Sequence, residues 1–331
     1  MSKVMFITTA NDKDAIPRPL LDRMEVIELS GYLETEKVEI AKRHLIPKQL
    51  EKHGLKKCQL TIADEAIVEL IRGYTHEAGV RELERETAAV CRKAAMDIGS
   101  GKARVRVGKQ KLAAYLGAPK YTHGAIDAIN EIGLANGLAW TSFGGETLQI
   151  EVQIVPGSGQ VILTGKLGDV MQESAKAALT FIKAHAEEFS ITLPLDKKDI
   201  HLHVPEGAVP KDGPSAGITI MTAMLSALSG IPARADTAMT GEITLRGRVL
   251  EIGGLREKLL AAYRAGIKRV LIPRANEKDL SDVPNEVKAN MEIIGVASAF
   301  DVIPLALEHT PQKTADAFIP QHAHSGAAAA Q

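Results

Sequence analysis

One serine in this chain stands where the backbone around it can stabilise a negative oxygen. Ser215 lies in the segment Pro-Lys-Asp-Gly-Pro-Ser-Ala-Gly at residues 210–217, on a tight Gly-Pro turn. An apolar run over residues 218–228 follows at once and predicts a buried helix. At a helix N-terminus, free N–H groups and the positive end of the dipole can hold the oxyanion formed in acyl transfer. Ser215 is therefore a candidate nucleophile, and the alternative is an ordinary helix N-cap.

One lysine is predicted on the buried face of a helix. On a helical wheel that starts at Leu255 and steps about 100° per residue, Lys258 falls in the same arc as Leu255 and Ala262, whereas Leu260 falls among charged residues. Burial lowers the pKa of a lysine, and a drop of about 3 units would leave the amine largely neutral near pH 7.5. A neutral amine can accept the proton of Ser215, so Lys258 is a candidate general base. The alternative is a lysine that keeps its ammonium group in water.

The serine and lysine segments together resemble the proteolytic domain of the Lon family of ATP-dependent serine proteases. The segment at residues 210–217 is the family's nucleophile motif, and residues 239–262 resemble its lysine segment. Residues 137–140 and 163–174 also resemble Lon segments. Glu251 stands where the family often has proline before Ile-Gly-Gly. It is neither the serine nor the lysine, so the assignment of those two residues stands.

The resemblance implies a role for each of these residues. Ser215 is implied to be the nucleophile and Lys258 the general base. Thr240 is implied to hydrogen-bond the lysine amine, and Asp212, close to the serine in sequence, is a candidate to form a salt bridge or gate the loop. The turn from Gly213 to Ala216 is expected to supply the N–H groups of the oxyanion hole, and the sequence leaves open which of them do so. The peptide-bond chemistry then needs no cofactor and no metal.

The N-terminal part resembles the end of an AAA+ ATPase module of the same family. Asn11, after a predicted strand over residues 4–7, is implied to be the sensor 1 residue that contacts the γ-phosphate or the attacking water. Arg23 is implied to be the arginine finger, which reaches the nucleotide of a neighbouring subunit, and Arg81 to be sensor 2. Each places a donor or a cation beside a polyphosphate. Without the resemblance, all three are ordinary surface residues.

The parts of an ATPase that bind phosphate and magnesium do not occur in the sequence. No Gly-x-x-x-x-Gly-Lys-Ser/Thr segment is present, nor is the acidic segment that would hold Mg²⁺. We therefore expect the chain to be part of a longer protein, and expect ATP and magnesium to act only in the full-length protein. This chain is expected neither to bind ATP well nor to hydrolyse it.

Composition and charge exclude other classes of protein. The 331 residues are 45% hydrophobic, which suits two or more globular domains. With 40 basic and 41 acidic residues, the formal charge of −1 gives no general electrostatic case for binding nucleic acid or an anionic membrane. Two cysteines and no signal peptide predict a cytoplasmic location. The most apolar run, residues 216–231, carries four hydroxyl residues and is too short to span a membrane.

A metal site is not expected. His201 and His203 share one face of a predicted strand, but no third ligand lies at a suitable spacing. His322 and His324 lie in a tail that ends Gly-Ala-Ala-Ala-Ala-Gln.

Two regions of different character must position the candidate residues. Residues 31–117 predict a small helical bundle, with helices at residues 36–50, 61–73 and 80–98, the first of which Pro47 should end or kink. Residues 99–119 predict a basic, glycine-containing connection. Residues 120–310 predict one α/β domain. Its predicted strands span residues 148–154, 161–164, 200–204, 270–273 and 291–296, and its predicted helices residues 169–189, 215–228, 255–265 and 304–308.

The predicted fold is therefore of the α+β, multidomain class. Residues 1–30 are interpreted as the C-terminal remnant of an AAA+ α/β core, because two short strands cannot bury a core alone. Residues 31–117 are interpreted as the helical AAA+ lid subdomain and residues 120–310 as a Lon-type α/β proteolytic domain. Residues 311–331 are expected to be a disordered tail.

The prediction is a serine endopeptidase of the ATP-dependent Lon type. The resemblance implies unfolded, damaged, tagged or regulatory proteins as substrates and a homohexameric ring, with no membrane partner. Three alternatives stay open. The chain is a latent assembly fragment, or another Ser–Lys enzyme such as an amidase, or its helical region binds DNA through basic residues that include Lys42, Arg43, Lys56 and Lys57. The nearly equal numbers of basic and acidic residues do not indicate DNA binding as the main function.

Overall fold

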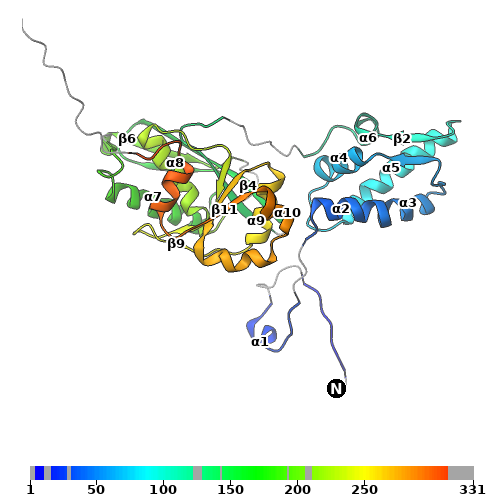
Figure 1. Cartoon of the computed structure of the whole chain (residues 1–331), viewed down its shortest axis with the longest axis horizontal. Helices are drawn as coiled ribbons and strands as arrows, with labels where there is room; N and C mark the ends of the chain where they lie inside the picture. Colours follow the sequence, from blue (N-terminus) through cyan, green and yellow to red (C-terminus); the bar gives the residue numbers. More distant parts are fainter. Residues whose placement is uncertain are drawn as a thin grey trace, which may run out of the picture.

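The computed structural model describes residues 4–10, 16–27, 31–121, 129–141, 144–191, 194–205 and 211–311. Figure 1 shows a helical body and a larger α/β body side by side, with a short N-terminal segment below them. This arrangement confirms the predicted fold class, a small helical domain followed by an α/β domain.

The helical body has its own apolar core. Its helices are α2 (Glu34–Ile40), η1 (Ala41–Leu45), α3 (Ile46–Lys52), α4 (Asp64–Tyr74), α5 (Arg81–Gly99) and α6 (Lys109–Leu116). Leu70, Tyr74, Leu83 and Val90 are among the residues fully buried between them. Apolar side chains at helical spacing therefore produced the bundle as predicted.

Pro47 does not end the first helix, contrary to that part of the prediction. α2, η1 and α3 follow one another without a break from residue 34 to residue 52. Pro47 lies in the first turn of α3, directly after the wider π-helical turn η1. Proline is tolerated in a first turn because its missing N–H is not needed there.

Residues 99–119 are also more ordered than the predicted connection. β2 (Val105–Val107) pairs in parallel with β1 (Leu60–Ile62), and α6 follows it. The buried side chains of Val105, Val107 and Leu112 join these elements to the helical core. Burial of three apolar residues explains why this basic segment folds.

The α/β body is built on a seven-stranded sheet. The strands lie in the order β11-β10-β7-β3-β4-β6-β5, and only β4 runs against the others. Their bounds are β3 (Leu134–Thr141), β4 (Gly144–Pro156), β5 (Val161–Thr164), β6 (Lys198–His203), β7 (Thr237–Met239), β10 (Arg269–Pro273) and β11 (Glu292–Val296). β8 (Glu242–Ile243) and β9 (Val249–Leu250) form a separate small hairpin.

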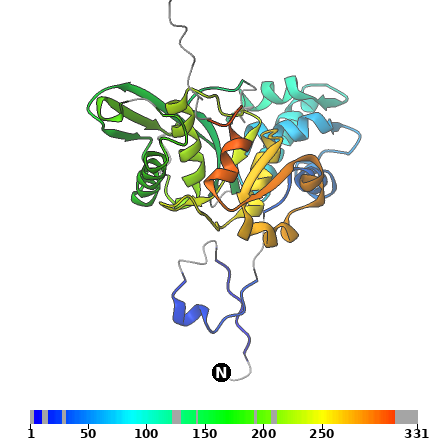
Figure 2. The ribbon, with the colours of Figure 1, turned by 60° about the vertical axis from the view of Figure 1, so that its left-hand side comes forward.

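Helices cover both faces of this sheet (Figure 2). α7 (Asp169–Ala184), α8 (Gly217–Ser229) and α11 (Ala299–Ala306) enclose one core, and α9 (Leu255–Arg264) and α10 (Asn285–Asn290) enclose the other. Ala135 and Leu138 of β3 face opposite cores, as the alternation of a strand requires. The short helices η2 (Leu195–Lys197), η3 (Pro214–Ala216) and η4 (Arg274–Asp282) complete the body.

Several predicted bounds differ from the observed ones. α7 ends at residue 184 rather than 189, and α11 begins at residue 299 rather than 304. Ser298 and Asp301 form a capping box that starts α11, and Pro304 lies inside that helix. Strands β3 and β7 and helices η4 and α10 were not predicted as elements. None of the helices within the described ranges is long and apolar enough to cross a bilayer.

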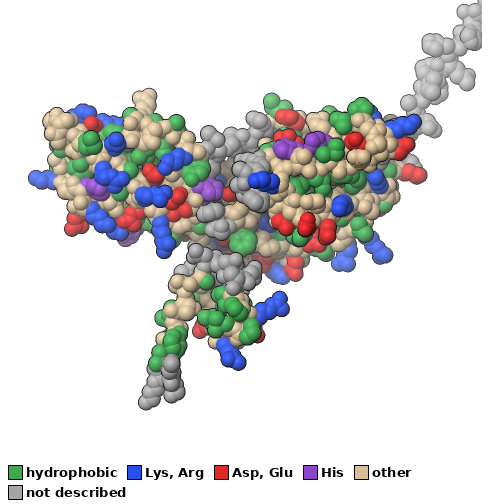
Figure 3. Space-filling model, turned by 180° about the vertical axis from the view of Figure 1, so that it is seen from behind, with side chains coloured by type: hydrophobic (Ala, Val, Ile, Leu, Met, Phe, Trp, Pro, Cys, Tyr) green, Lys and Arg blue, Asp and Glu red, His purple; other side chains and the backbone are tan. Residues whose placement is uncertain are grey.

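The N-terminal segment contains no strand in its described residues, so the prediction of two short strands, one at residues 4–7 and one in the apolar segment of residues 17–27, is wrong. α1 (Arg18–Leu21) is its one helix there. The side chains of residues 4–7 are 56–85% exposed, and apolar side chains are visible over the segment in Figure 3. A strand needs hydrogen-bonded neighbours, and none of the described strands lies beside these residues.

Candidate active site

Ser215 lies in a single 3₁₀ turn, η3, that leads directly into α8. Gly213 precedes it at φ +126°, a backbone conformation that favours glycine. The carbonyl oxygen of Ser215 accepts a hydrogen bond from the N–H of Gly241 at 2.7 Å. The turn is thereby fixed to the segment that follows β7, and the Ser215 side chain is half-buried.

The hydroxyl of Thr240 joins the lysine to the serine turn. Lys258 Nζ donates to Thr240 Oγ1 at 3.1 Å, and Thr240 Oγ1 donates to the carbonyl oxygen of Ser215 at 3.3 Å. Thr240 is fully buried, and its N–H bonds to the carbonyl of Leu271. Among the described residues, no hydrogen bond joins Ser215 Oγ to Lys258 Nζ. Such bonds often tighten only when substrate is present.

Lys258 is buried on the face of α9 that the wheel predicted. Only 2% of the residue is exposed, and Leu255 and Ala262 are buried beside it. Among the residues that the structure describes, no carboxylate lies within ion-pair distance of Nζ. Burial lowers the pKa of Lys258 to about 8. This drop is smaller than the one that full neutrality would need, and it leaves roughly a quarter of the amine neutral at about pH 7.5.

Asp212 anchors the serine turn to the start of α7. Its Oδ1 accepts hydrogen bonds from the N–H of Met171 at 3.0 Å and of Gly213 at 2.9 Å. The N–H of Gly168 bonds to the carbonyl of Lys211 at 2.8 Å. A Cβ on Gly168 would lie only 2.2 Å from the carboxyl carbon of Asp212, so glycine is required for this approach.

The backbone amides of the turn are partly occupied. The N–H of Gly213 is donated to Asp212, and the N–H of Gly217 is donated to the carbonyl of Pro214. Ala216 is buried directly before α8. In this conformation Gly213 must release its bond before it can stabilise an oxyanion.

The three residues implied to sense nucleotide are not brought to this site. Asn11 lies outside the described residues. Arg23 is exposed in the turn after α1, and Arg81 is exposed at the first position of α5. The structure therefore collects Ser215, Thr240 and Lys258 and leaves the two arginines on separate elements.

The two histidines of β6 form a hydrogen-bonded group with Thr164. His201 Nε2 and His203 Nδ1 lie 3.0 and 2.7 Å from Thr164 Oγ1. Within the described ranges, no three His, Cys, Asp or Glu side chains are arranged to hold a metal ion. His322 and His324 lie outside the described residues.

The hairpin β3–β4 packs closely against α9, which the sequence pattern did not indicate. A Cβ on Gly145 would lie 1.9 Å from the carbonyl oxygen of Glu257, the residue before Lys258. Trp140 packs on Gly254, the residue before α9, where a Cβ would lie 2.8 Å from the indole. Two glycines thus permit the hairpin to lie directly on the lysine helix.

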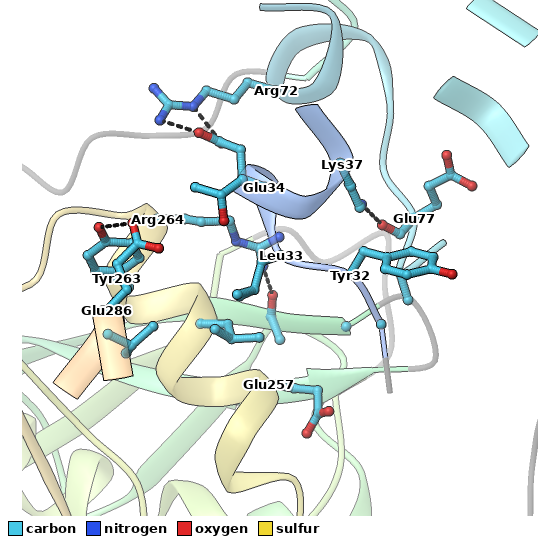
Figure 4. Close-up of a pocket in the computed structure, with 17 residues that line it drawn as sticks. Tyr32, Leu33, Glu34, Lys37, Arg72, Glu77, Glu257, Tyr263, Arg264 and Glu286 are labelled. Atoms are coloured by element: carbon cyan, nitrogen blue, oxygen red, sulfur yellow. Dashed lines mark hydrogen bonds and ion pairs between the residues drawn. The ribbon is translucent and has the colours of Figure 1, made fainter. Parts of the chain in front are cut away.

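A cavity of about 330 Å³ separates the helical body from α9 (Figure 4). Lys37 is buried in its wall and donates to the carbonyl of Glu77. Arg264 also lines it and donates to the carbonyl of Gly145 at 2.8 Å. Leu260, the apolar residue that the helical wheel placed among charged ones, lines the same cavity. It therefore faces the space between the two bodies.

The comparisons with known proteins agree on one family. A family model described as the Lon protease (S16) C-terminal proteolytic domain matches residues 106–309, and one described as the Lon protease AAA+ ATPase lid domain matches residues 51–107. Proteins named Lon protease are 57% identical in Nitratidesulfovibrio vulgaris over 93% of this chain and 38% of the relative, and 55% identical in Bacillus thuringiensis over 93% and 39%. One from Escherichia coli K12 is 54% identical over 94% and 40%. The chain thus spans about two fifths of the length of these relatives.

Proposed function

The chain belongs to the Lon protease family, and from that membership and the geometry around Lys258 we propose that it acts as a serine endopeptidase with a Ser–Lys dyad. Ser215 Oγ attacks the scissile carbonyl, and Lys258 Nζ takes the hydroxyl proton. Lys258 then gives that proton to the leaving amine. Thr240 holds the lysine amine beside the serine turn.

One observation carries this proposal. Lys258 is only 2% exposed, its amine donates to the hydroxyl of Thr240, and that hydroxyl donates in turn to the backbone carbonyl of Ser215. Burying an ammonium group without a counter-charge is costly, and buried lysines with a lowered pKa cluster at functional sites. The pKa of about 8 suits a base that works near neutral pH.

The remaining assignments concern the whole protein. We propose that residues 1–30 and 31–117 are the AAA+ remnant and lid, and that residues 120–310 are the proteolytic domain. In the longer protein, ATP and Mg²⁺ would act through a phosphate loop that this chain lacks, with Asn11, Arg23 and Arg81 as nucleotide-sensing residues. We also propose that the longer protein assembles into a homohexamer in the cytoplasm and acts on unfolded or tagged proteins.

The test is hydrolysis of a fluorogenic unstructured peptide, with and without ATP. Ser215→Ala and Lys258→Ala should each lose activity while their circular dichroism stays unchanged. Ser281→Ala and Lys176→Ala, at exposed positions outside the site, should keep it. Cleavage by Ser215→Ala, or full activity of a folded Lys258→Ala, would show that another group does the chemistry.

A further inference from the structure

A histidine of the helical body contacts the hairpin that packs on the lysine helix. His76 lies in the loop between α4 and α5, and its Nε2 is 2.9 Å from Glu146 Oε1. Glu146 is on β4, opposite Ala139 of β3. Both side chains are 35% exposed, so the pair is partly shielded from water. The ring of Tyr121 lies 5.3 Å from the imidazole.

The residue next to Glu146 is the one in closest contact with α9. Gly145 lies against the carbonyl of Glu257, and its own carbonyl accepts a hydrogen bond from Arg264 at 2.8 Å. The hairpin therefore touches α9 directly before Lys258 and again at its last residue. A shift of Gly145 would be passed to Lys258, because packed elements transmit small displacements.

We infer that His76 and Glu146 are positioning residues, whose ion pair holds the hairpin β3–β4 against α9 from the side of the helical body and so keeps Lys258 Nζ on Thr240 Oγ1. This inference rests on the proposed role of Lys258 as the base. It gives the helical body an influence on the peptidase that needs no nucleotide.

The ion pair depends on pH. The hydrogen bond with Glu146 raises the pKa of His76 above its ordinary value, and Glu82 also favours the charged form, whereas partial burial and Arg264 oppose it. While Glu146 stays ionised, a raised histidine pKa means that the stabilisation is fully present below the ordinary histidine pKa and is lost as pH rises through the raised value. The helical body should thus hold the hairpin most firmly on the acidic side of neutrality.

The test compares kcat/KM for the fluorogenic peptide from pH 6.5 to pH 9 in wild type, His76→Gln, Glu146→Gln and the double variant. Since a partly exposed pair contributes little, we expect His76→Gln to lower kcat/KM about twofold to fivefold at pH 6.5 and hardly at all at pH 9. The double variant should be no worse than either single one. His76→Arg should restore the wild-type rate at pH 6.5 and exceed it at pH 9, because arginine stays charged.

His53→Gln is the matched control, because His53 bonds to Gln49 within the helical body. It should leave the profile unchanged. A purely structural role would lower activity equally at every pH and would not be rescued by arginine, and either result would overturn the inference.

Hydrogen exchange separates this inference from the proposed function. At pH 6.5, His76→Gln should speed exchange of the amides of α9, whether or not the chain cleaves peptides. Unchanged exchange together with an unchanged pH profile would show that the pair does not position α9. If the wild type does not cleave peptides but His76→Gln still speeds exchange in α9, the catalytic proposal is refuted and the positioning role of the pair is not.

Discussion

The pH dependence of peptide cleavage is the most direct measure of the proposed base. If Lys258 must be neutral to accept the Ser215 proton, activity follows its deprotonated fraction. With a pKa of about 8, that fraction rises from about 1% at pH 6 to about half at pH 8. We therefore expect log kcat/KM to climb with a slope near one, gain roughly 50-fold between these two values, and level off above about pH 9.

The assay is initial-rate hydrolysis in buffers of constant ionic strength, with substrate below KM. Lys258→Arg serves as the second arm, because a guanidinium cannot be deprotonated at these pH values. A folded Lys258→Arg should lose at least the factor of about 10² to 10⁴ that general-base catalysis supplies.

Two results would refute the reasoning. A profile that keeps rising beyond pH 10 would give the lysine its ordinary pKa and hence place it in water. Substantial activity in Lys258→Arg would show that no neutral amine is needed at residue 258.

Three further predictions follow from the same geometry. Lys258→Met removes a buried amine whose pKa is lowered to about 8 by burial, so the free energy of unfolding at pH 7 should rise by about 3 kcal/mol while activity is lost, as denaturant titration will show; an unchanged midpoint would contradict it. Gly145→Ala forces a Cβ toward the carbonyl of Glu257 and should cost about 1–3 kcal/mol of stability and raise the kinetic pKa, with Gly99→Ala, in open space, as control. Asp212→Ala removes the oxygen that accepts hydrogen bonds from Met171 in α7 and Gly213 in the serine turn, and should cost about 1–2 kcal/mol and lower kcat, whereas Asp212→Asn, which keeps one oxygen, should lose less; equal losses would argue against the anchor.

Local patterns in the sequence were enough to place the lysine. Lys258 is the charge that shares a helix face with Leu255 and Ala262, and a period of 3.6 residues carries that information within two turns. The alternation along residues 148–154 predicted β4 in the same way. Both signals show which side of an element is buried, and the order of apolar and polar residues within that one element is enough to show it.

Contacts between distant segments carry no such signal. Thr240 lies 25 residues from Ser215 and 18 from Lys258, and only the family resemblance suggested its role. His76 and Glu146 are 70 residues apart and polar, so no periodicity relates them. The strand predicted at residues 4–7 failed for a related reason: an apolar run becomes a strand only beside a partner, and the described residues offer none.

The hydrogen-bond arrangement around Lys258 favours the catalytic contact once the lysine loses its proton. Thr240 has one hydroxyl proton, and it is already donated to the carbonyl of Ser215. A charged amine needs only acceptors, and Thr240 Oγ1 is one of them. A neutral amine has a lone pair that must find a donor, because leaving it unpaired in a buried site costs free energy. The hydroxyl of Ser215 can supply this donor, because Ser215 is on the turn that Thr240 already holds. Deprotonation of Lys258 and the approach of Ser215 Oγ should therefore be coupled, so that the same rise in pH prepares the base and aligns the nucleophile.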